Sequence, residues 1–249
     1  MKQFGLIGYP LAHSFSKKYF EEKFQRESIV ESGYGLFELK RIEELPILLQ
    51  SNPDLIGLNV TIPYKQSVLD YLDDVSAEAK EIGAVNCIKV VGGDTNQGKK
   101  LIGYNTDTFG FRESLSGLIK DANNLRAFVL GTGGSSKAVS YVLRYMNIDF
   151  VLVSREKNGT FITYSEVEKH LSTSNLFVNT TPLGMFPDTD SFAPIPYHLL
   201  TPKDFLFDLV YNPAETEFLK RGKAAGAITK NGLEMLQLQA EKSWDIWNT

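Results

Sequence analysis

LRAFVLGTGGSSKAV, the stretch from Leu125 to Val139, decides the fold of the second half of this chain. Its first six residues are mostly apolar and run into three glycines, which predicts a buried strand that ends in a tight turn. Apolar residues then recur at helical spacing, which predicts a helix directly after the turn. Glycines let the backbone approach a ligand closely, and the start of a helix offers free N–H groups and a positive dipole end. The stretch therefore predicts a phosphate-binding turn between a strand and a helix.

The glycine spacing matches the dinucleotide-binding fingerprint GxGxxG incompletely. Gly131 and Gly133 occupy the first two glycine positions, but Ser136 stands at the sixth position, where the fingerprint has Gly or Ala. A flexible turn in any α/β domain explains these residues equally well. Residues elsewhere in the chain are needed to distinguish a dinucleotide-binding turn from a flexible turn.

The composition is that of a globular protein with two domains. The chain has 249 residues, of which 43% are hydrophobic, enough for two cores. Its net charge of -4 provides no basic surface for nucleic acid or an anionic membrane, so we expect small-molecule partners held at a local site. Cys87 is the single cysteine, and no stretch has the pattern of a signal peptide or a membrane span. These features favour a cytoplasmic enzyme, although a cytoplasmic binding protein has the same composition.

Strands and helices alternate along the chain, as they do in βαβ units. The predicted strands are 2–8, 34–39, 55–61, 86–91, 101–105, 125–130, 148–154, 176–181 and 205–210. Besides the helix after the glycines, the predicted helices are 16–26, 42–50, 66–72, 76–82, 107–118 and 215–225. The polar segment GGDTNQGKK, 92–100, is predicted to be an exposed hairpin tip.

We place the domain boundary near Thr106. The last segment puts Leu233, Leu236, Ala240, Trp244 and Trp247 on one face of a helix. Such a helix is expected to pack back across the first domain. The predicted organisation is a first α/β domain of residues 1–106 completed by 233–249, and a nucleotide-binding domain of residues 107–232.

Arg155 is the residue that indicates the cofactor. It lies 22 residues after Gly133, where the second strand of the glycine-rich unit ends and where a dinucleotide enzyme contacts the adenosine ribose. An NAD enzyme has a carboxylate there, whereas a guanidinium pairs with the 2′-phosphate of NADP. Arg155 therefore favours NADP, while Glu156 directly after it keeps NAD as an alternative.

A lysine and an aspartate offer acid–base chemistry. Lys65 is the last residue of the stretch GLNVTIPYK and lies at or just before the start of a predicted helix. The dipole of that helix disfavours the charged form of the lysine, which suits a group that exchanges a proton near neutral pH. A mobile surface lysine is the alternative. Asp107 in GYNTD offers a carboxylate that can hold this lysine, although Thr106 or Asp107 can simply cap the following helix.

Other polar side chains are candidate ligands of a small molecule. Ser14 and Ser16 stand at a helix entrance and can donate to a carboxylate, or one of them is only a helix cap. Asn86 is either a turn residue or a hydrogen-bonding ligand. Met235 and Gln239 lie four apart on the last helix, so they share a face and can line one pocket, although a solvated glutamine is the simpler alternative. His13 is expected to be structural. No metal-binding spacing occurs among His13, His170, His198 and Cys87.

Nine motifs together resemble the shikimate dehydrogenase family. In chain order they are HSFS, GLNVTIPYK, GAVNC, GYNTD, GTGGSSK, VSRE, NTTPLGM, DLVYNP and GLEMLQLQA, which extend from Ser14 to Gln239. The resemblance implies two α/β domains around a cleft, the second of them Rossmann-like. It also implies reduction of 3-dehydroshikimate to shikimate with NADPH, on the route to aromatic amino acids.

The resemblance also implies roles for individual residues. Lys65 and Asp107 match the catalytic pair. The substrate carboxylate would meet Ser14, Ser16 and Tyr211, and its hydroxyls would meet Asn59, Thr61, Asn86, Asp107 and Gln239. On the cofactor side, the pyrophosphate would meet Gly131, Gly133, Gly134 and Ser135, the 2′-phosphate would meet Ser154 and Arg155, and the nicotinamide end would meet Thr180, Leu209, Gly232 and Met235.

The chain departs from the family pattern at three places. Lys17 stands where many members have proline, and Cys87 stands where many have threonine. The stretch after Arg155 is short and interrupted by Gly159, which leaves no room for the helix usual there. The alternatives are a relative that also oxidises quinate with NAD or NADP, and a non-catalytic nucleotide-binding regulatory module. Retention of both Lys65 and Asp107 argues against the module.

Overall fold

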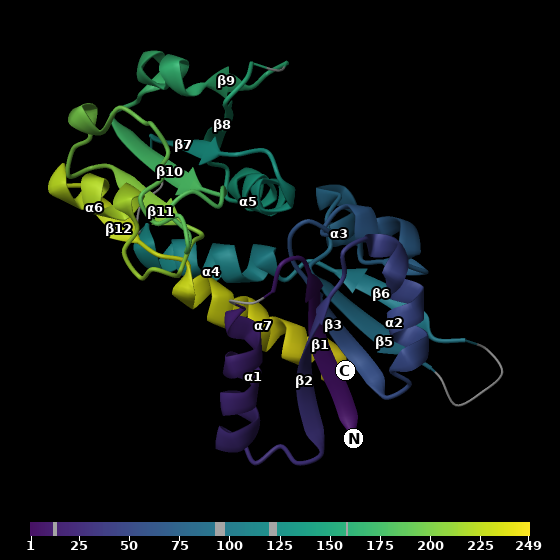
Figure 1. Cartoon of the computed structure of the whole chain (residues 1–249). Helices are drawn as coiled ribbons and strands as arrows, with labels where there is room; N and C mark the ends of the chain where they lie inside the picture. The colour runs from purple at the N-terminus through teal and green to yellow at the C-terminus, as the bar shows by residue number, and fades with distance from the viewer. Residues whose placement is uncertain (12–13, 93–97, 120–123, 158) are drawn as a thin grey trace. The chain divides into compact units, whose positions relative to one another are not determined.

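The structure, a computed structural model, describes residues 1–11, 14–92, 98–119, 124–157 and 159–249 (Figure 1). The chain divides into two compact units. Unit 1 comprises Met1–Thr106 and Gln239–Thr249, and unit 2 comprises Asp107–Leu238. Each unit is built on its own six-stranded sheet.

Unit 1 has a mixed sheet. Its strands are β1 (Lys2–Gly8), β2 (Ser32–Glu38), β3 (Leu55–Val60), β4 (Asp74–Val75), β5 (Cys87–Val91) and β6 (Lys100–Tyr104). Its helices are α1 (Phe15–Arg26), α2 (Leu45–Ser51), α3 (Ala77–Ile82) and the 3-10 helices η1 (Ile42–Glu44) and η2 (Ser67–Tyr71). The strand order is β2-β1-β3-β5-β6-β4, in which β5 runs antiparallel to β3 and β6 and the other pairs are parallel.

Both faces of the unit 1 sheet are buried. Phe4 of β1 belongs to a cluster with Phe20 of α1 and Trp247 near the C-terminus. Ile7 of the same strand belongs to a second cluster with Leu45 of α2. A strand that is covered on both sides needs apolar residues on both, which explains the nearly continuous apolar run of β1.

The last helix, α7 (Leu233–Asn248), begins in unit 2 and ends in unit 1. Its end packs closely on the unit 1 sheet, because a Cβ at Gly57 of β3 would lie 2.6 Å from atoms of the Trp247 ring. The indole Nε1 of Trp247 donates to the carbonyl oxygen of Ile88 over 3.0 Å. Glycine at position 57 therefore lets α7 lie against the strand, and the indole hydrogen bond holds it there.

Unit 2 has a parallel sheet. Its strands are β7 (Leu125–Leu130), β8 (Asp149–Ser154), β9 (Ile162–Thr163), β10 (Ser174–Asn179), β11 (Phe205–Asp208) and β12 (Ile228–Lys230). Its other helices are α4 (Asp107–Leu118), α5 (Gly134–Tyr145), α6 (Glu217–Ala224) and the 3-10 helices η3 (Tyr164–His170) and η4 (Tyr197–Leu199). The order β12-β11-β10-β7-β8-β9, with every pair parallel, is the doubly wound order of dinucleotide-binding domains. The prediction of a Rossmann-like second domain is confirmed.

Two apolar clusters cover the two faces of this sheet. Phe111 of α4 and Val139 of α5 belong to one cluster, and Val167 of η3 and Phe218 of α6 belong to the other. Figure 1 shows these helices around the strands of unit 2. Because the strand order reverses between β7 and β10, a crevice for a ligand is expected outside their carboxyl ends.

Several predicted elements differ from the observed ones. The predicted helix 66–72 is the 3-10 helix η2, and the predicted helix 42–50 is η1 followed by α2. The strands β4, β9 and β12 were not predicted, since two or three residues form no readable pattern, and the seven-residue 3-10 helix η3 was not predicted either. The strands β5 and β6 pair antiparallel as predicted, while the hairpin tip at 93–97 lies outside the described residues.

Candidate active site

The glycine turn of unit 2 is open toward a ligand. Gly131 has a φ of 109°, and a Cβ there would lie 2.9 Å from Thr180 Oγ1, so only glycine fits. Gly133 caps the 12-residue helix α5 with no side-chain hydrogen bond, and a Cβ there would meet no atom within 4 Å. The space beside Gly133, at the start of α5, is therefore open. A pyrophosphate fits this turn by charge and by shape.

Ser136 explains the departure from the glycine fingerprint. It is buried, with 2% of its surface exposed, and its hydroxyl donates to the carbonyl oxygen of Gly133 over 2.6 Å. The third glycine of the fingerprint permits close packing of the helix on the strand. A small serine whose hydroxyl is hydrogen-bonded within the turn meets the same requirement.

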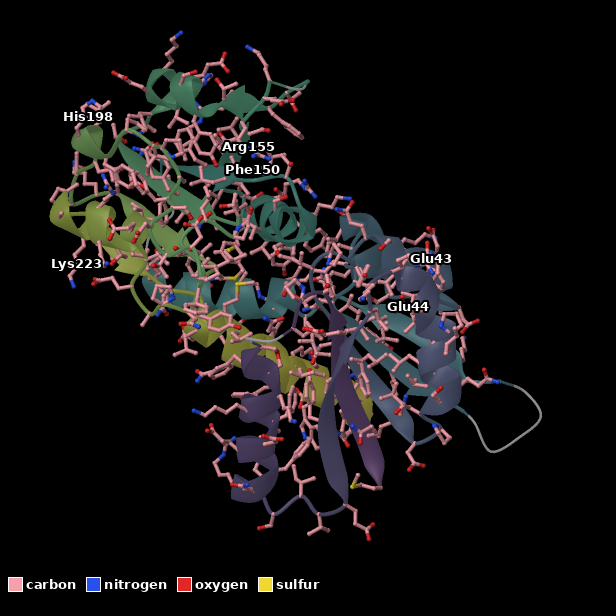
Figure 2. All side chains as sticks on the ribbon, in the orientation of Figure 1. Glu43, Glu44, Phe150, Arg155, His198 and Lys223 are labelled. Atoms are coloured by element: carbon pink, nitrogen blue, oxygen red, sulfur yellow. The ribbon has the colours of Figure 1, made fainter. Side chains whose placement is uncertain are left out.

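The end of β8 lies next to the glycine turn. Leu130 of β7 is paired with Val153 of β8, and the N–H of Gly131 donates to the carbonyl oxygen of Val153 over 2.9 Å. Ser154 ends the strand, and the exposed Arg155 follows it (Figure 2). The structure thus brings together the residues predicted to bind pyrophosphate and 2′-phosphate.

Arg155 also acts on its surroundings electrostatically. Burial raises the pKa of the Tyr164 phenol, and the positive charge of Arg155 opposes this rise. Glu156 is exposed, and its N–H donates to Ser154 Oγ over 3.4 Å. Between β8 and β10 the described residues contain β9 and η3 and no α-helix, as the short stretch after Arg155 predicts.

Further residues predicted to bind the cofactor lie after the ends of β10, β11 and β12, on the other side of the point where the strand order reverses. Thr180 Oγ1 donates to the carbonyl oxygen of Leu130 over 2.6 Å, which places this side chain beside the glycine turn. A Cβ at Gly232 would lie 2.2 Å from the carbonyl oxygen of Leu209, so the two backbones need glycine to pass each other. Met235 is 5% exposed and belongs to the core of unit 2.

A buried carboxyl that the sequence did not single out supports these strand ends. Asp208 at the end of β11 is fully buried and accepts hydrogen bonds from Thr216 Oγ1 (2.5 Å), Asn179 Nδ2 (2.9 Å) and the N–H of Val210 (3.0 Å). Burial raises the pKa of Asp208 to about 6, and the three donors oppose the rise. The sequence signal available for Asp208 was the pair of motifs NTTPLGM and DLVYNP, which place polar residues at the ends of two buried strands.

Lys65 lies in unit 1, in the turn between β3 and η2. Its side chain is half-buried, and its carbonyl oxygen accepts from the N–H of Val85 over 2.7 Å. The α-helix predicted to begin at this lysine is not formed, because η2 is a 3-10 helix of five residues. Thr61, four residues before Lys65, is half-buried, and its N–H donates to the carbonyl oxygen of Ile7 over 2.9 Å.

Three amides predicted to bind substrate come together in unit 1. Asn86 Nδ2 donates to Gln239 Oε1 over 2.9 Å. Asn59 Nδ2 donates to the carbonyl oxygen of Asn86 over 3.4 Å. Residues from β3, from the position directly before β5 and from α7 therefore form one polar cluster. The solvated alternative for Gln239 is wrong, because its side chain is part of this cluster.

Ser14 caps α1, as one of its two interpretations states. Its Oγ accepts from the N–H of Ser16 over 3.3 Å. Both serines are half-buried. His13 lies outside the described residues.

Two predicted residues belong to unit 2. Asp107 is the first residue of α4 and is 1% exposed, while Tyr211 follows β11 and is half-buried. Thr106, the last residue of unit 1 before α4, is fully buried.

No group of three or more His, Cys, Asp and Glu side chains within the described ranges is arranged to hold a metal ion. None of the helices in the described part of the chain is both long and apolar enough to cross a membrane.

Comparison with known proteins identifies relatives over the whole chain. The model of the shikimate dehydrogenase substrate binding domain matches residues 6–88. A shikimate dehydrogenase (NADP(+)) from Clostridium beijerinckii is 40% identical over 259 residues, which cover 99% of this chain and 92% of the relative.

Solved structures agree with this assignment. Shikimate dehydrogenase 1 from Peptoclostridium difficile is 36% identical, with a TM-score of 0.85 over 100% of this chain and 92% of that chain. The shikimate 5-dehydrogenase of Thermus thermophilus, solved in complex with NADP(H) and shikimate, is 31% identical, with a TM-score of 0.84 over 99% of this chain and 93% of that chain. This chain therefore belongs to the shikimate dehydrogenase family.

Proposed function

We propose that this chain is an NADP-dependent shikimate dehydrogenase, which reversibly reduces 3-dehydroshikimate to shikimate in aromatic amino acid (chorismate) biosynthesis. The observation that carries the proposal is the position of Arg155, directly after β8 and beside an open glycine turn, in a chain 40% identical to an NADP-dependent relative. A guanidinium at this strand end suits a 2′-phosphate.

The residues of unit 2 would hold the cofactor. Gly131, Gly133, Gly134 and Ser135 would bind the pyrophosphate through the start of α5, and Ser154 and Arg155 would bind the 2′-phosphate. Thr180, Leu209, Gly232 and Met235 would line the nicotinamide end. When bound, NADPH supplies the hydride for the reduction.

The substrate would be held mainly by unit 1. Ser14 and Ser16, joined by Tyr211, would donate to its carboxylate. Its hydroxyls would be held by Asn59, Thr61, Asn86, Asp107 and Gln239. We assign residues 1–106 and the last helix, 233–249, to substrate binding and residues 107–232 to NADP binding.

Lys65 and Asp107 would carry out the proton transfer. Reduction of a ketone to an alcohol adds a hydride to the carbonyl carbon and a proton to the oxygen, and a lysine ammonium beside that oxygen supplies this proton. Asp107 would be the second group of this catalytic pair. In the reverse direction the lysine takes the proton back from the alcohol.

A second candidate is a quinate/shikimate dehydrogenase that uses NAD or NADP. Glu156, exposed and adjacent to Arg155, favours it, because a carboxylate at this strand end can accept from the ribose 2′-hydroxyl of NAD. We place either enzyme in the cytoplasm, as a monomer or homodimer whose partners are small molecules.

Turnover of the purified chain with each cofactor tests the proposal. Absorbance of NADPH or NADH is followed with 3-dehydroshikimate, and formation of NADPH or NADH is followed with shikimate or quinate. The proposal predicts rapid turnover with NADPH and 3-dehydroshikimate. Turnover of neither cofactor would refute it, and a preference for NADH with quinate would favour the second candidate.

A further inference from the structure

Ser243 is the centre of a buried hydrogen-bond network in unit 1. It lies on α7 and is fully buried. Its Oγ accepts from Asn59 Nδ2 over 2.9 Å and donates to the carbonyl oxygen of Gln239 over 2.9 Å. Thr106 Oγ1 lies 3.1 Å from the same oxygen. One hydroxyl thus contacts two residues of the proposed substrate site and the residue that precedes Asp107.

The directions of the hydrogen bonds around Asn86 follow from a single backbone group. The N–H of Thr106 can only donate, and it lies 2.6 Å from Asn86 Oδ1, which identifies that atom as the oxygen. Asn86 Nδ2 must then donate, to Thr106 Oγ1 over 3.0 Å and to Gln239 Oε1 over 2.9 Å. Because its oxygen is already occupied by Asn86, the Gln239 side chain offers the N–H donors of Nε2 to a ligand.

Tyr34 fixes the other side of the network. This residue of β2 is 4% exposed, and its hydroxyl donates to Asn59 Oδ1 over 2.8 Å. Because Ser243 Oγ donates its one proton to the Gln239 carbonyl oxygen, it accepts from Asn59, whose amide nitrogen therefore faces Ser243 and whose oxygen faces Tyr34. Burial raises the pKa of this phenol, and the Ser16 side chain opposes the rise, so a proposed carboxylate ligand lies near the network.

We propose that Ser243 and Tyr34 are positioning residues for substrate binding. They hold Asn59 and the turn of α7 that contains Gln239. Gln239 then presents its N–H donors to the substrate, and an oxygen of the substrate accepts hydrogen bonds from them. Neither residue needs to touch the substrate. This inference rests on the proposed function, because it concerns the substrate site of that enzyme.

The alternative is that the network only satisfies buried polar groups. A structural role would change stability, whereas a positioning role changes the Michaelis constant for 3-dehydroshikimate while leaving the constant for NADPH unchanged. If the network holds substrate equally in the ground and transition states, kcat stays nearly constant. The Michaelis constants for 3-dehydroshikimate and for NADPH therefore distinguish a positioning role from a purely structural role.

The test compares Ser243→Ala with Ser76→Ala. Ser76 also belongs to unit 1 and loses one hydroxyl hydrogen bond, to the N–H of Ala79 at the start of α3, but it takes no part in the network. Tyr34→Phe is the second network variant. It removes only the hydroxyl and keeps the ring that stacks on Phe20 with centroids 4.5 Å apart, so it folds even if Ser243→Ala does not.

Steady-state kinetics and thermal melting are measured for all four proteins. We expect KM for 3-dehydroshikimate to rise about tenfold in Ser243→Ala and in Tyr34→Phe, with KM for NADPH unchanged, and we expect Ser76→Ala to lower only the melting temperature. If the native chain turns over but the network variants match Ser76→Ala in KM, the inference is overturned and the proposed function stands. If the native chain does not turn over, both are overturned.

Discussion

Asn86 Nδ2 donates to Gln239 Oε1 over 2.9 Å, a contact between residues 153 positions apart in the sequence. One residue precedes β5 and the other belongs to the last helix. The contact binds the end of the chain to the sheet of unit 1 at the point where substrate is proposed to lie. It also fixes which atom of Gln239 a ligand meets.

Gln239→Glu tests this polarity. A carboxylate keeps an oxygen for Asn86 but replaces the N–H donors by a second acceptor, so KM for 3-dehydroshikimate should rise about tenfold or more. Gln237→Glu is the matched control, since it places the same charge on an exposed position of the same helix. Equal KM values for the two variants would contradict the assigned donor role.

Arg155→Ala should change the cofactor preference. Loss of a guanidinium pairing with a 2′-phosphate should raise KM for NADPH by about ten- to a hundredfold, because hydrogen bonds to charged groups contribute about 1.5–3 kcal/mol. KM for NADH should stay the same. Arg144→Ala, at the exposed end of α5 away from the glycine turn, controls for loss of positive charge. An unchanged ratio of the two Michaelis constants would refute the role of Arg155.

Asp208 should make unit 2 less stable as pH rises. Its pKa is about 6 in the fold against 3.8 as the ordinary value, so the folded chain binds more protons than the unfolded chain between these pH values. Stability from this group is therefore present below about pH 4 and declines, by up to about 3 kcal/mol, as pH rises through about 6.

Urea unfolding of the native chain and of Asp208→Asn across this pH range measures the effect. The variant has a single acceptor for three donors, so a constant offset in stability is expected. The difference between the two proteins should shift in favour of the variant as pH increases. A difference that is independent of pH would contradict the raised pKa.

The buried Lys23 should contribute more stability than the exposed Lys17 on the same helix. It is 3% exposed and pairs with Glu241 over 2.6 Å and with Glu27 over 2.9 Å. Lys23→Met leaves both carboxylates without this partner, at a cost of about 1–2 kcal/mol, because each is over a third exposed and stays hydrated.

Lys17→Met is the control on the same helix. Lys17 pairs with Glu21 over 3.8 Å, and both side chains are about half exposed, so the loss should stay below about 0.5 kcal/mol. Urea midpoints of the two variants check the order. Equal midpoints would show that the buried ion pair adds no stability.

The sequence predicted the parts of this protein that depend on local pattern. The glycine turn and its helix were readable from apolar spacing, and β1 was readable from its apolar run. The type of η2 was not readable, since a five-residue segment spans less than two helical turns and does not distinguish a period of 3.0 from one of 3.6. Ser243 and Tyr34 were missed because their contacts join β2, β3 and α7, and no spacing along the chain encodes such a meeting.

Asp208 was missed for a different reason. An aspartate at the end of a strand is usually a turn residue, and its burial under Thr216 and Asn179 appears only when β10 and β11 are paired. Glycine at position 57 has the same character, because its requirement comes from Trp247 at the other end of the chain.

The most direct test of the proposed reaction is the turnover number of Lys65→Ala with NADPH and 3-dehydroshikimate. Lys18→Ala, an exposed lysine on α1, is the control for loss of a charge in unit 1. Removal of the proton donor should lower kcat by about 10²–10⁴-fold while KM for NADPH stays constant, and Lys18→Ala should keep native kcat. Full kcat in Lys65→Ala would contradict the assignment of Lys65 as the proton donor.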